Sequence, residues 1–126
     1  MTVLINGSRE FSNYSLLEEK CYKILSPYLE RGDKIIIVEG GASGADTLAG
    51  KFAKENGFEL EIYWADWKNL GKRAGLLRNI EMVEGSRFGH KPDIFISFNM
   101  GTRGTQHTID YWKSKYPNKP IFEIKC

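Results

Sequence analysis

Two glycine-rich stretches of the chain combine small residues with hydroxyl and basic side chains. Residues 38–46 read VEGGASGAD, and residues 99–105 read NMGTRGT. Glycine lets backbone N–H groups turn toward one point, and the start of a following helix adds free N–H groups and the positive end of its dipole. Each stretch therefore predicts an anion site, although a tight strand-to-helix turn uses the same glycines. Neither stretch matches the P-loop or the dinucleotide-binding fingerprint.

Donor side chains accompany both stretches. Ser43 adds a hydroxyl to the first, and Arg103 adds a guanidinium, which suits phosphate, to the second. Arg9 follows the first apolar run, so we expect it on the same rim, although it could also be an ordinary surface arginine. Two such loops on one rim favour an anionic ligand over two coincidental turns. The predicted phosphate-binding residues are Gly7, Ser8, Arg9, Gly40, Gly41, Ser43, Gly44, Asp46, Trp67, Lys72, Arg78, Gly101, Thr102, Arg103, Gly104 and Thr105.

Arg78 and Glu81 are the candidate catalytic residues. They are three positions apart in a predicted helix, so they share a face, and we expect Arg78 to lie off the buried stripe. They form either an ordinary surface ion pair, worth roughly 0.5 kcal/mol, or a guanidinium and a carboxylate that face a substrate. The spacing fits both interpretations.

Residues 65–75, ADWKNLGKRAG, have neither helical nor strand periodicity. Irregular stretches of about ten residues in compact domains are often functional. Trp67 could stack on a base, although core packing is the favoured interpretation, and Lys72 or Arg73 could contact a phosphate. His90 and His107 have no cysteine or carboxylate at ligand spacing, so we expect no metal and no cofactor.

Apolar runs alternate regularly with amphipathic segments. Ser15 and Glu18 have the spacing of a capping box at the start of the first helix, and Gly32 ends that helix. The predicted third helix buries Leu76, Leu77, Ile80 and Val83, and the fourth carries Ile109 and Trp112. The predicted strands are residues 3–5, 35–38, 59–63, 93–98 and 120–124. The second and third predicted helices are 45–56 and 76–84, and residues 64–75 are predicted to be irregular.

This alternation predicts the fold class α/β. We expect a Rossmann-like three-layer α/β/α sandwich around a mainly parallel five-stranded sheet, formed by residues 1–126 as a single domain. Ligands of such sheets bind beyond the carboxyl ends of the strands. The loops after three of the strands, near Gly7, Gly40 and Gly101, should therefore gather on one rim.

Composition excludes several other classes. The chain is 41% hydrophobic and 27% charged, as in ordinary globular proteins, and its net charge of +2 gives no reason to expect a nucleic-acid or membrane surface. Met1 leads directly into a short apolar run without a signal peptide, so we expect a cytoplasmic protein. Cys21 and Cys126 predict neither a disulfide framework nor a metal-ligand pair.

Four motifs together resemble the SLOG superfamily, and its YspA-type branch of bacterial and phage proteins in particular. They are INGSREF, VEGGASGADTLAGKFA, ADWKNLGKRAGLLRNIEM and NMGTRGTQHTI, in this order over most of the chain. The resemblance implies a Rossmann-like fold and a nucleotide or nucleotide-derived ligand at the glycine loops. Related SLOG proteins often dimerise, which implies a homodimer.

The LOG-type enzymes of the same superfamily cleave the N-glycosidic bond of nucleoside 5′-monophosphates. Residues 78–82, RNIEM, are similar to their R-K-x-x-M motif, and residues 101–105 to their P-G-G-x-G-T motif. The resemblance places their catalytic glutamate at Thr108, which supplies neither a carboxylate nor a base. Glu81, Asp46 or Asp110 would have to substitute for it. The binding half of the pattern is thus better preserved than the catalytic half.

Three functions follow from the sequence. The first is the binding, for sensing or processing, of a nucleotide or another phosphate-containing small molecule. The second is a hydrolase acting on nucleoside monophosphates, with Glu81 or Asp46 as the replacement carboxylate. The third is single-stranded DNA binding, which distant SLOG relatives perform, but the modest charge makes a nucleic-acid partner the least favoured.

Overall fold

The computed structural model describes residues 1–126 as helices alternating with strands. In chain order the elements are β1 (Thr2–Gly7), α1 (Tyr14–Glu30), β2 (Ile36–Glu39), α2 (Ala45–Glu55), β3 (Glu59–Ile62), α3 (Trp67–Leu70), the 3-10 helix η1 (Gly71–Arg73), α4 (Ala74–Glu84), β4 (Ile94–Asn99), α5 (Arg103–Lys115) and β5 (Ile121–Lys125). No helix is both long and apolar enough to cross a membrane.

The five strands form one sheet in the order β3-β2-β1-β4-β5, and every neighbouring pair is parallel. The α/β sandwich predicted from the sequence is therefore confirmed, with an entirely parallel sheet. β1 lies in the centre, where Leu4 pairs with Val38 of β2 and with Phe95 of β4. The chain moves outward in one direction through β2 and β3, then crosses to β4. The switch point, where such sheets bind ligands, lies between β1 and β4.

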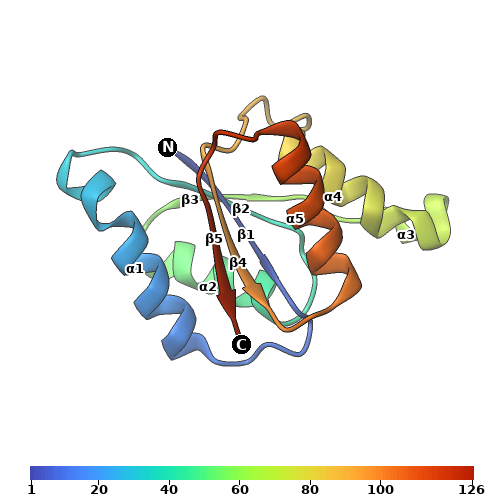
Figure 1. Cartoon of the computed structure of the whole chain (residues 1–126), viewed down its shortest axis with the longest axis horizontal. Coiled ribbons are helices and arrows are strands. Elements are labelled where there is room, and N and C mark those ends of the chain that lie inside the picture. Colours follow the sequence, from blue (N-terminus) through green and yellow to red (C-terminus); the bar gives the residue numbers. More distant parts are fainter.

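Helices cover both faces of the sheet (Figure 1). Each face carries one apolar cluster. On one face α1 and α2 pack through Leu17, Cys21 and Phe52 against alternate residues of the strands. On the other face α4 and α5 pack through Val83 and Trp112. The central strands carry buried residues on both sides, as parallel sheets require.

Helix α1 begins differently from the prediction. Its N-cap is Asn13, whose side chain accepts a hydrogen bond from the N–H of Leu16 at 3.1 Å, so Ser15 lies inside the helix. The capping-box prediction is therefore wrong, because an asparagine two residues earlier already satisfies the orphan N–H. The predicted end is confirmed, since Gly32 takes a φ of +83° and donates to the carbonyl of Leu29.

The segment from residue 64 to 84 departs most from the prediction. Residues 67–73 are helical rather than irregular, with Asp66 as the N-cap of α3. Helix α4 begins at Ala74, and its buried face is turned toward the site: Leu76 and Leu77 are exposed, whereas Arg78 is buried. The buried residues of α4 are Ala74, Arg78, Asn79, Met82 and Val83.

Candidate functional site

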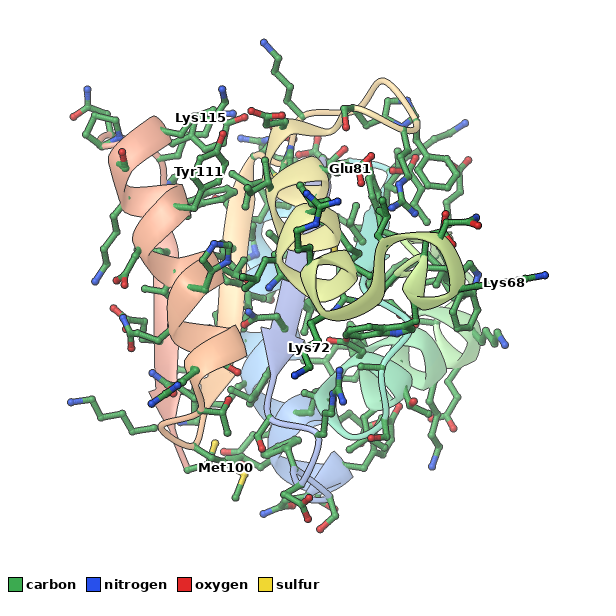
Figure 2. The ribbon with its side chains drawn as sticks, turned by 90° about the vertical axis from the view of Figure 1, so that its right-hand side faces the viewer. Lys68, Lys72, Glu81, Met100, Tyr111 and Lys115 are labelled. Carbon is green, nitrogen blue, oxygen red and sulfur yellow. The ribbon has the colours of Figure 1, made fainter.

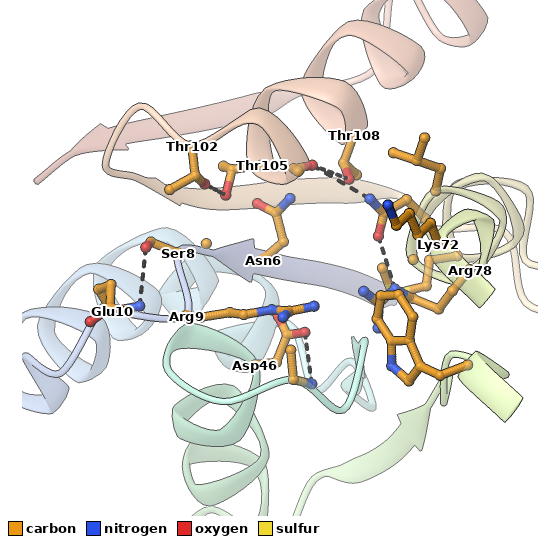
Figure 3. Close-up of a pocket in the computed structure, with 18 residues that line it drawn as sticks. Asn6, Ser8, Arg9, Glu10, Asp46, Lys72, Arg78, Thr102, Thr105 and Thr108 are labelled. Carbon is orange, nitrogen blue, oxygen red and sulfur yellow. Dashed lines mark hydrogen bonds between the residues drawn. The ribbon is translucent and has the colours of Figure 1, made fainter.

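A hollow of about 430 Å³ opens at the carboxyl ends of the strands, over the switch point (Figure 3). Five segments contribute to its wall: the loop after β1, the start of α2, the α3–η1 segment, α4 and the start of α5. Loops from different strands therefore meet at one edge of the sheet, as the sequence predicted. The lining residues are Asn6, Gly7, Ser8, Arg9, Glu10, Ala42, Asp46, Trp67, Lys72, Gly75, Leu76, Arg78, Asn79, Met82, Thr102, Gly104, Thr105 and Thr108.

A second hollow of about 330 Å³ adjoins the first and shares four lining residues with it, Arg9, Ala42, Trp67 and Arg78. Its other lining residues are Gly40, Gly41, Ser43, Trp64 and Ala65. The Arg9 guanidinium lies 5.6 Å from the centre of the Trp67 ring, in cation–π range, at the boundary between the two hollows. The second hollow is lined by Trp64 as well as Trp67, so it is the more aromatic of the two.

Arg78 is the buried cation of the site, with only 7% of its surface exposed. Its guanidinium donates to the carbonyl of Gly40 and, from Nε, to Oδ1 of Asn79 at 2.9 Å. No carboxylate oxygen lies within 4.0 Å, and burial lowers the pKa of Arg78 from its ordinary value. A buried guanidinium that contacts no carboxylate, and whose charge is compensated only by the more distant Asp46 and Glu39, favours the binding of an anion. The prediction that Arg78 lies off the buried stripe is wrong.

The first turn of α5 presents free backbone donors to the same hollow. Its N-cap, Thr102, makes no side-chain cap bond, and its hydroxyl instead donates to Oγ1 of Thr105 at 2.8 Å. The N–H groups of Arg103, Gly104 and Thr105 have no acceptor in the chain; the first helical N–H to be paired is that of Gln106, bound to the carbonyl of Thr102. These groups and the helix dipole form a ready anion site.

Asn6 provides a further donor at the centre of the hollow. It is 6% exposed, and its Oδ1 accepts a hydrogen bond from Ser97 at 2.6 Å, which fixes the orientation of the amide. The Nδ2 group makes no hydrogen bond in the chain and faces the hollow between the β1 loop and the start of α5 (Figure 3). An oriented donor of this kind is suited to an acceptor oxygen of a ligand.

The loop between β2 and α2 is held by two buried carboxyl groups. Glu39 accepts the N–H of Gly41, and Asp46 accepts the N–H of Ala42 at 3.2 Å. The N–H of Ala45 is also paired, with the carbonyl of Ser8. Burial raises the pKa of Glu39 to about 7 and that of Asp46 to about 6, while the loop N–H groups and nearby arginines oppose these shifts. Much of the expected donor set of this loop is therefore already occupied.

The α3–η1 segment closes the outer side of the hollow. It contains no buried residue, and Trp67 is 49% exposed, so the favoured core-packing interpretation of Trp67 is wrong. Trp67 and Lys72 both line the hollow, the first as an indole wall and the second as an exposed cation. This segment thus supplies chemistry to the site without contributing to the core.

The predicted site residues fall into three groups. Those that line the first hollow are Gly7, Ser8, Arg9, Asp46, Trp67, Lys72, Arg78, Thr102, Gly104 and Thr105, and those that line only the second are Gly40, Gly41 and Ser43. The remaining four, Gly44, Gly101, Arg103 and Glu81, line neither.

Glu81 is bound elsewhere. Its carboxylate pairs with Arg87 at 2.9 Å instead of with Arg78. Figure 2 shows Lys72 beside the beginning of α4 and Glu81 farther along that helix.

Sequence reasoning missed several lining residues. Asn6, Glu10, Asn79 and Met82 lie within the INGSREF and RNIEM motifs, but none of them was predicted as a site residue; the position of Asn6 at the end of a buried strand could have indicated it. Thr108 does line the hollow, but its hydroxyl donates to the carbonyl of Gly104 at 3.2 Å. It therefore offers the hollow no base. The structure also contains no group of three side chains placed to hold a metal ion.

The fold and the hollow define a Rossmann-like protein with a polar site at the switch point of a parallel sheet. A sequence profile described as "YspA, cpYpsA-related SLOG family" matches residues 1–70. The "Gene 61 protein" of Mycobacterium phage D29 is 36% identical over 117 residues, covering 85% of this chain and 84% of the phage protein. The chain therefore belongs to this SLOG family. No solved structure matches it significantly.

Proposed function

We propose that the protein binds a nucleotide or nucleotide-derived ligand whose phosphate lies at the start of α5. The supporting observation is the convergence of three kinds of donor on one hollow. They are the unpaired first-turn N–H groups of α5, the unpaired Nδ2 of Asn6, and the N–H groups of Arg78 beyond those bonded to Gly40 and Asn79. A volume of about 430 Å³ is within the range of small-molecule sites. The Trp67 and Trp64 rings beside it offer stacking surfaces to a base.

Calorimetric titration with inorganic phosphate, sulfate and a panel of nucleoside 5′-mono- and diphosphates tests this function. We expect at least one nucleotide to bind more tightly than phosphate alone, and phosphate to compete with it. Arg78→Gln should weaken both interactions roughly 10- to 100-fold, whereas Arg87→Gln, which removes an arginine already paired with Glu81, should leave them intact. The proposal fails if neither phosphate nor any nucleotide binds.

The second candidate is N-glycosidic hydrolysis of nucleoside monophosphates. The observation in its favour is that the buried carboxyl group of Asp46 lines the phosphate-binding hollow with a pKa raised to about 6 by burial, near the value that suits a general base. Such a carboxylate would activate water or stabilise the positive charge that develops on the sugar. Arg78 would hold the phosphate and thereby fix the sugar.

The hydrolase is tested by incubating the protein with a panel of nucleotides and measuring the released free base by chromatography. We expect Asp46→Asn to reduce the rate by roughly 100-fold or more, as the loss of a general base does. Glu81→Gln serves as the control, since Glu81 does not line the hollow. If no base is released at any pH between about 5 and 8, near the pKa suited to this chemistry, the hydrolase is excluded and the binding function is unaffected.

A further inference from the structure

Oδ2 of the Asp46 carboxyl group faces the backbone of its own loop, where the N–H groups of Ala42 and Gly40 favour the ionised form. Oδ2 accepts the N–H of Ala42, while Oδ1 makes no hydrogen bond. The residue is 6% exposed, yet Oδ1 is not among the fully enclosed polar atoms without a partner, so it opens onto the hollow that the residue lines. A carboxylate oxygen that is open to the hollow and unpaired in the chain is available to accept a donor from the ligand.

The charge of the Asp46 carboxylate limits which group of the ligand can lie against it. No Lys, Arg or His nitrogen lies within 4.0 Å of its carboxylate, although the more distant Arg78 and Arg9 favour its ionised form. An anionic group of the ligand placed against this oxygen would be repelled. The proposed phosphate position lies on the opposite wall, beside Thr102 and Thr105, with Asn6 between the two walls (Figure 3). Asp46 therefore faces a neutral part of the ligand that carries hydrogen-bond donors.

The arrangement of the two hollows indicates which neutral part of a nucleotide faces Asp46. The aromatic rings lie in the second hollow, where Trp64 and Trp67 provide the surface for a base. Asp46 lines the first hollow, across Asn6 from the proposed phosphate position (Figure 3), and its own loop supplies Gly40, Gly41 and Ser43 to the second, aromatic hollow. In a nucleotide, the group between phosphate and base is the sugar, and ribose carries two adjacent hydroxyl groups that can donate to a carboxylate.

We infer that Asp46 accepts hydrogen bonds from the ribose hydroxyls of the ligand and selects ribonucleotides over nucleotides that lack these hydroxyls. This inference rests on the proposed nucleotide-binding function. It adds a sugar specificity to that function, and it disfavours single-stranded DNA as a ligand, because a DNA chain has no 2′-hydroxyl and its 3′-oxygen is esterified.

Titration with the four common ribonucleoside 5′-monophosphates and their 2′,3′-dideoxy counterparts, near pH 8, tests the inference. We expect the best ribonucleotide to bind the unmodified protein roughly tenfold or more tightly than its dideoxy form, as expected for hydrogen bonds to a charged group. Asp46→Asn keeps the shape of the side chain but removes its charge. It should reduce this ratio to roughly threefold or less, because hydrogen bonds to a neutral group are about half as strong, while inorganic phosphate binds no more weakly than before.

Glu19→Gln is the matched control, because Glu19 is an exposed carboxyl on α1, remote from the hollow. It should leave the ratio unchanged. Equal binding of ribo- and dideoxynucleotides by the unmodified protein would overturn the role of Asp46 while leaving the phosphate site in place, and this comparison needs no variant. A ratio that survives Asp46→Asn would overturn it as well. If neither phosphate nor any nucleotide binds, the proposed function falls together with this inference.

Discussion

The two glycine loops on the rim are similar in sequence but opposite in chemistry. Between β2 and α2, two buried carboxyl groups accept loop N–H groups, and the loop packs against the β1 loop. Before α5, no carboxyl group intervenes, and the first-turn N–H groups have no acceptor. The first loop thus uses its N–H groups internally and carries carboxyl groups, whereas the second leaves its N–H groups available to an anion. Glycine content alone does not show whether such a loop can bind an anion. The hydrogen-bond partners of its N–H groups do.

The largest expected difference between the loops is in stability. Gly44 and Gly101 have φ values of +76° and +83°, but a Cβ on Gly44 would lie 2.5 Å from the carbonyl oxygen of Arg9, whereas one on Gly101 would meet nothing within 4 Å. Gly101→Ala should lower the free energy of unfolding by roughly 1–2 kcal/mol. Gly44→Ala should lower it by about 1–3 kcal/mol more, through overpacking. Urea denaturation measures both, and equal losses would contradict the distinction.

Removing the buried cation should affect ligand binding next most strongly. Arg78→Gln should weaken phosphate and nucleotide binding roughly 10- to 100-fold, as expected for the loss of charge-assisted hydrogen bonds. Arg78→Lys should retain part of the affinity, because it keeps the charge without the fork of donors. Denaturation curves of both variants establish that they are folded. An unchanged affinity in folded Arg78→Gln would show that Arg78 does not contact the anion.

The carboxyl-held loop should also make stability depend on pH. Since burial raises the pKa of Glu39 from 4.5 to about 7, the folded protein binds its proton more tightly than the unfolded chain does. This contribution to stability is fully present below about pH 4.5 and is lost as the pH rises through about 7. Asp46 acts in the same direction between 3.8 and about 6.

The variant Glu39→Gln isolates the contribution of Glu39 to the pH dependence of the free energy of unfolding. Relative to the unmodified protein, the variant should lose less stability between about pH 5 and pH 8, by on the order of 2 kcal/mol. The exposed Glu19→Gln should follow the unmodified protein. Parallel pH profiles of Glu39→Gln and the unmodified protein would show that folding does not raise the pKa of Glu39.

The smallest effect concerns the uncapped helix. Thr102→Asp introduces a carboxylate at the N-cap of α5, where the threonine makes no cap bond. We expect a gain of roughly 0.5–1 kcal/mol in the free energy of unfolding, from the cap bond and the helix dipole. Phosphate affinity should fall at the same time, because the new carboxylate occupies the same N–H groups. Thr102→Ser is the control, and a variant that gained stability without losing affinity would place the ligand elsewhere.

The alternation of apolar and amphipathic segments was enough to predict the sandwich and the gathering of three loops on one rim. It could not give the strand order, because any right-handed arrangement of these units has the same periodicity. It also oriented α4 incorrectly. Leu76 and Leu77 suggested the buried face, but the first turns of α4 overhang the hollow, where Arg78 is buried against a carbonyl and an amide rather than against apolar side chains. Hydrophobicity patterns do not detect buried polar contacts of this kind.

The incorrect predictions about Glu81 and Trp67 have another cause, because both residues contact side chains outside the local sequence pattern. Three-residue spacing suggested Glu81 for Arg78, but Arg87 competes for Glu81 from beyond the end of α4. Trp67 was expected in the core, as tryptophan often is. It instead starts a four-residue helix too short for its periodicity to be read, and its ring contacts Arg9, a residue distant in sequence.

The distribution of tryptophans gives the molecule its own optical reporter. Trp112 is fully buried, whereas Trp64 and Trp67 are 62% and 49% exposed and line the second hollow. Red-shifted emission should therefore come mainly from the two indoles at the site, and blue-shifted emission from the core. A base stacked in the second hollow would quench only the red component. Unlabelled protein would then report occupancy and core integrity at separate wavelengths in a single fluorescence spectrum.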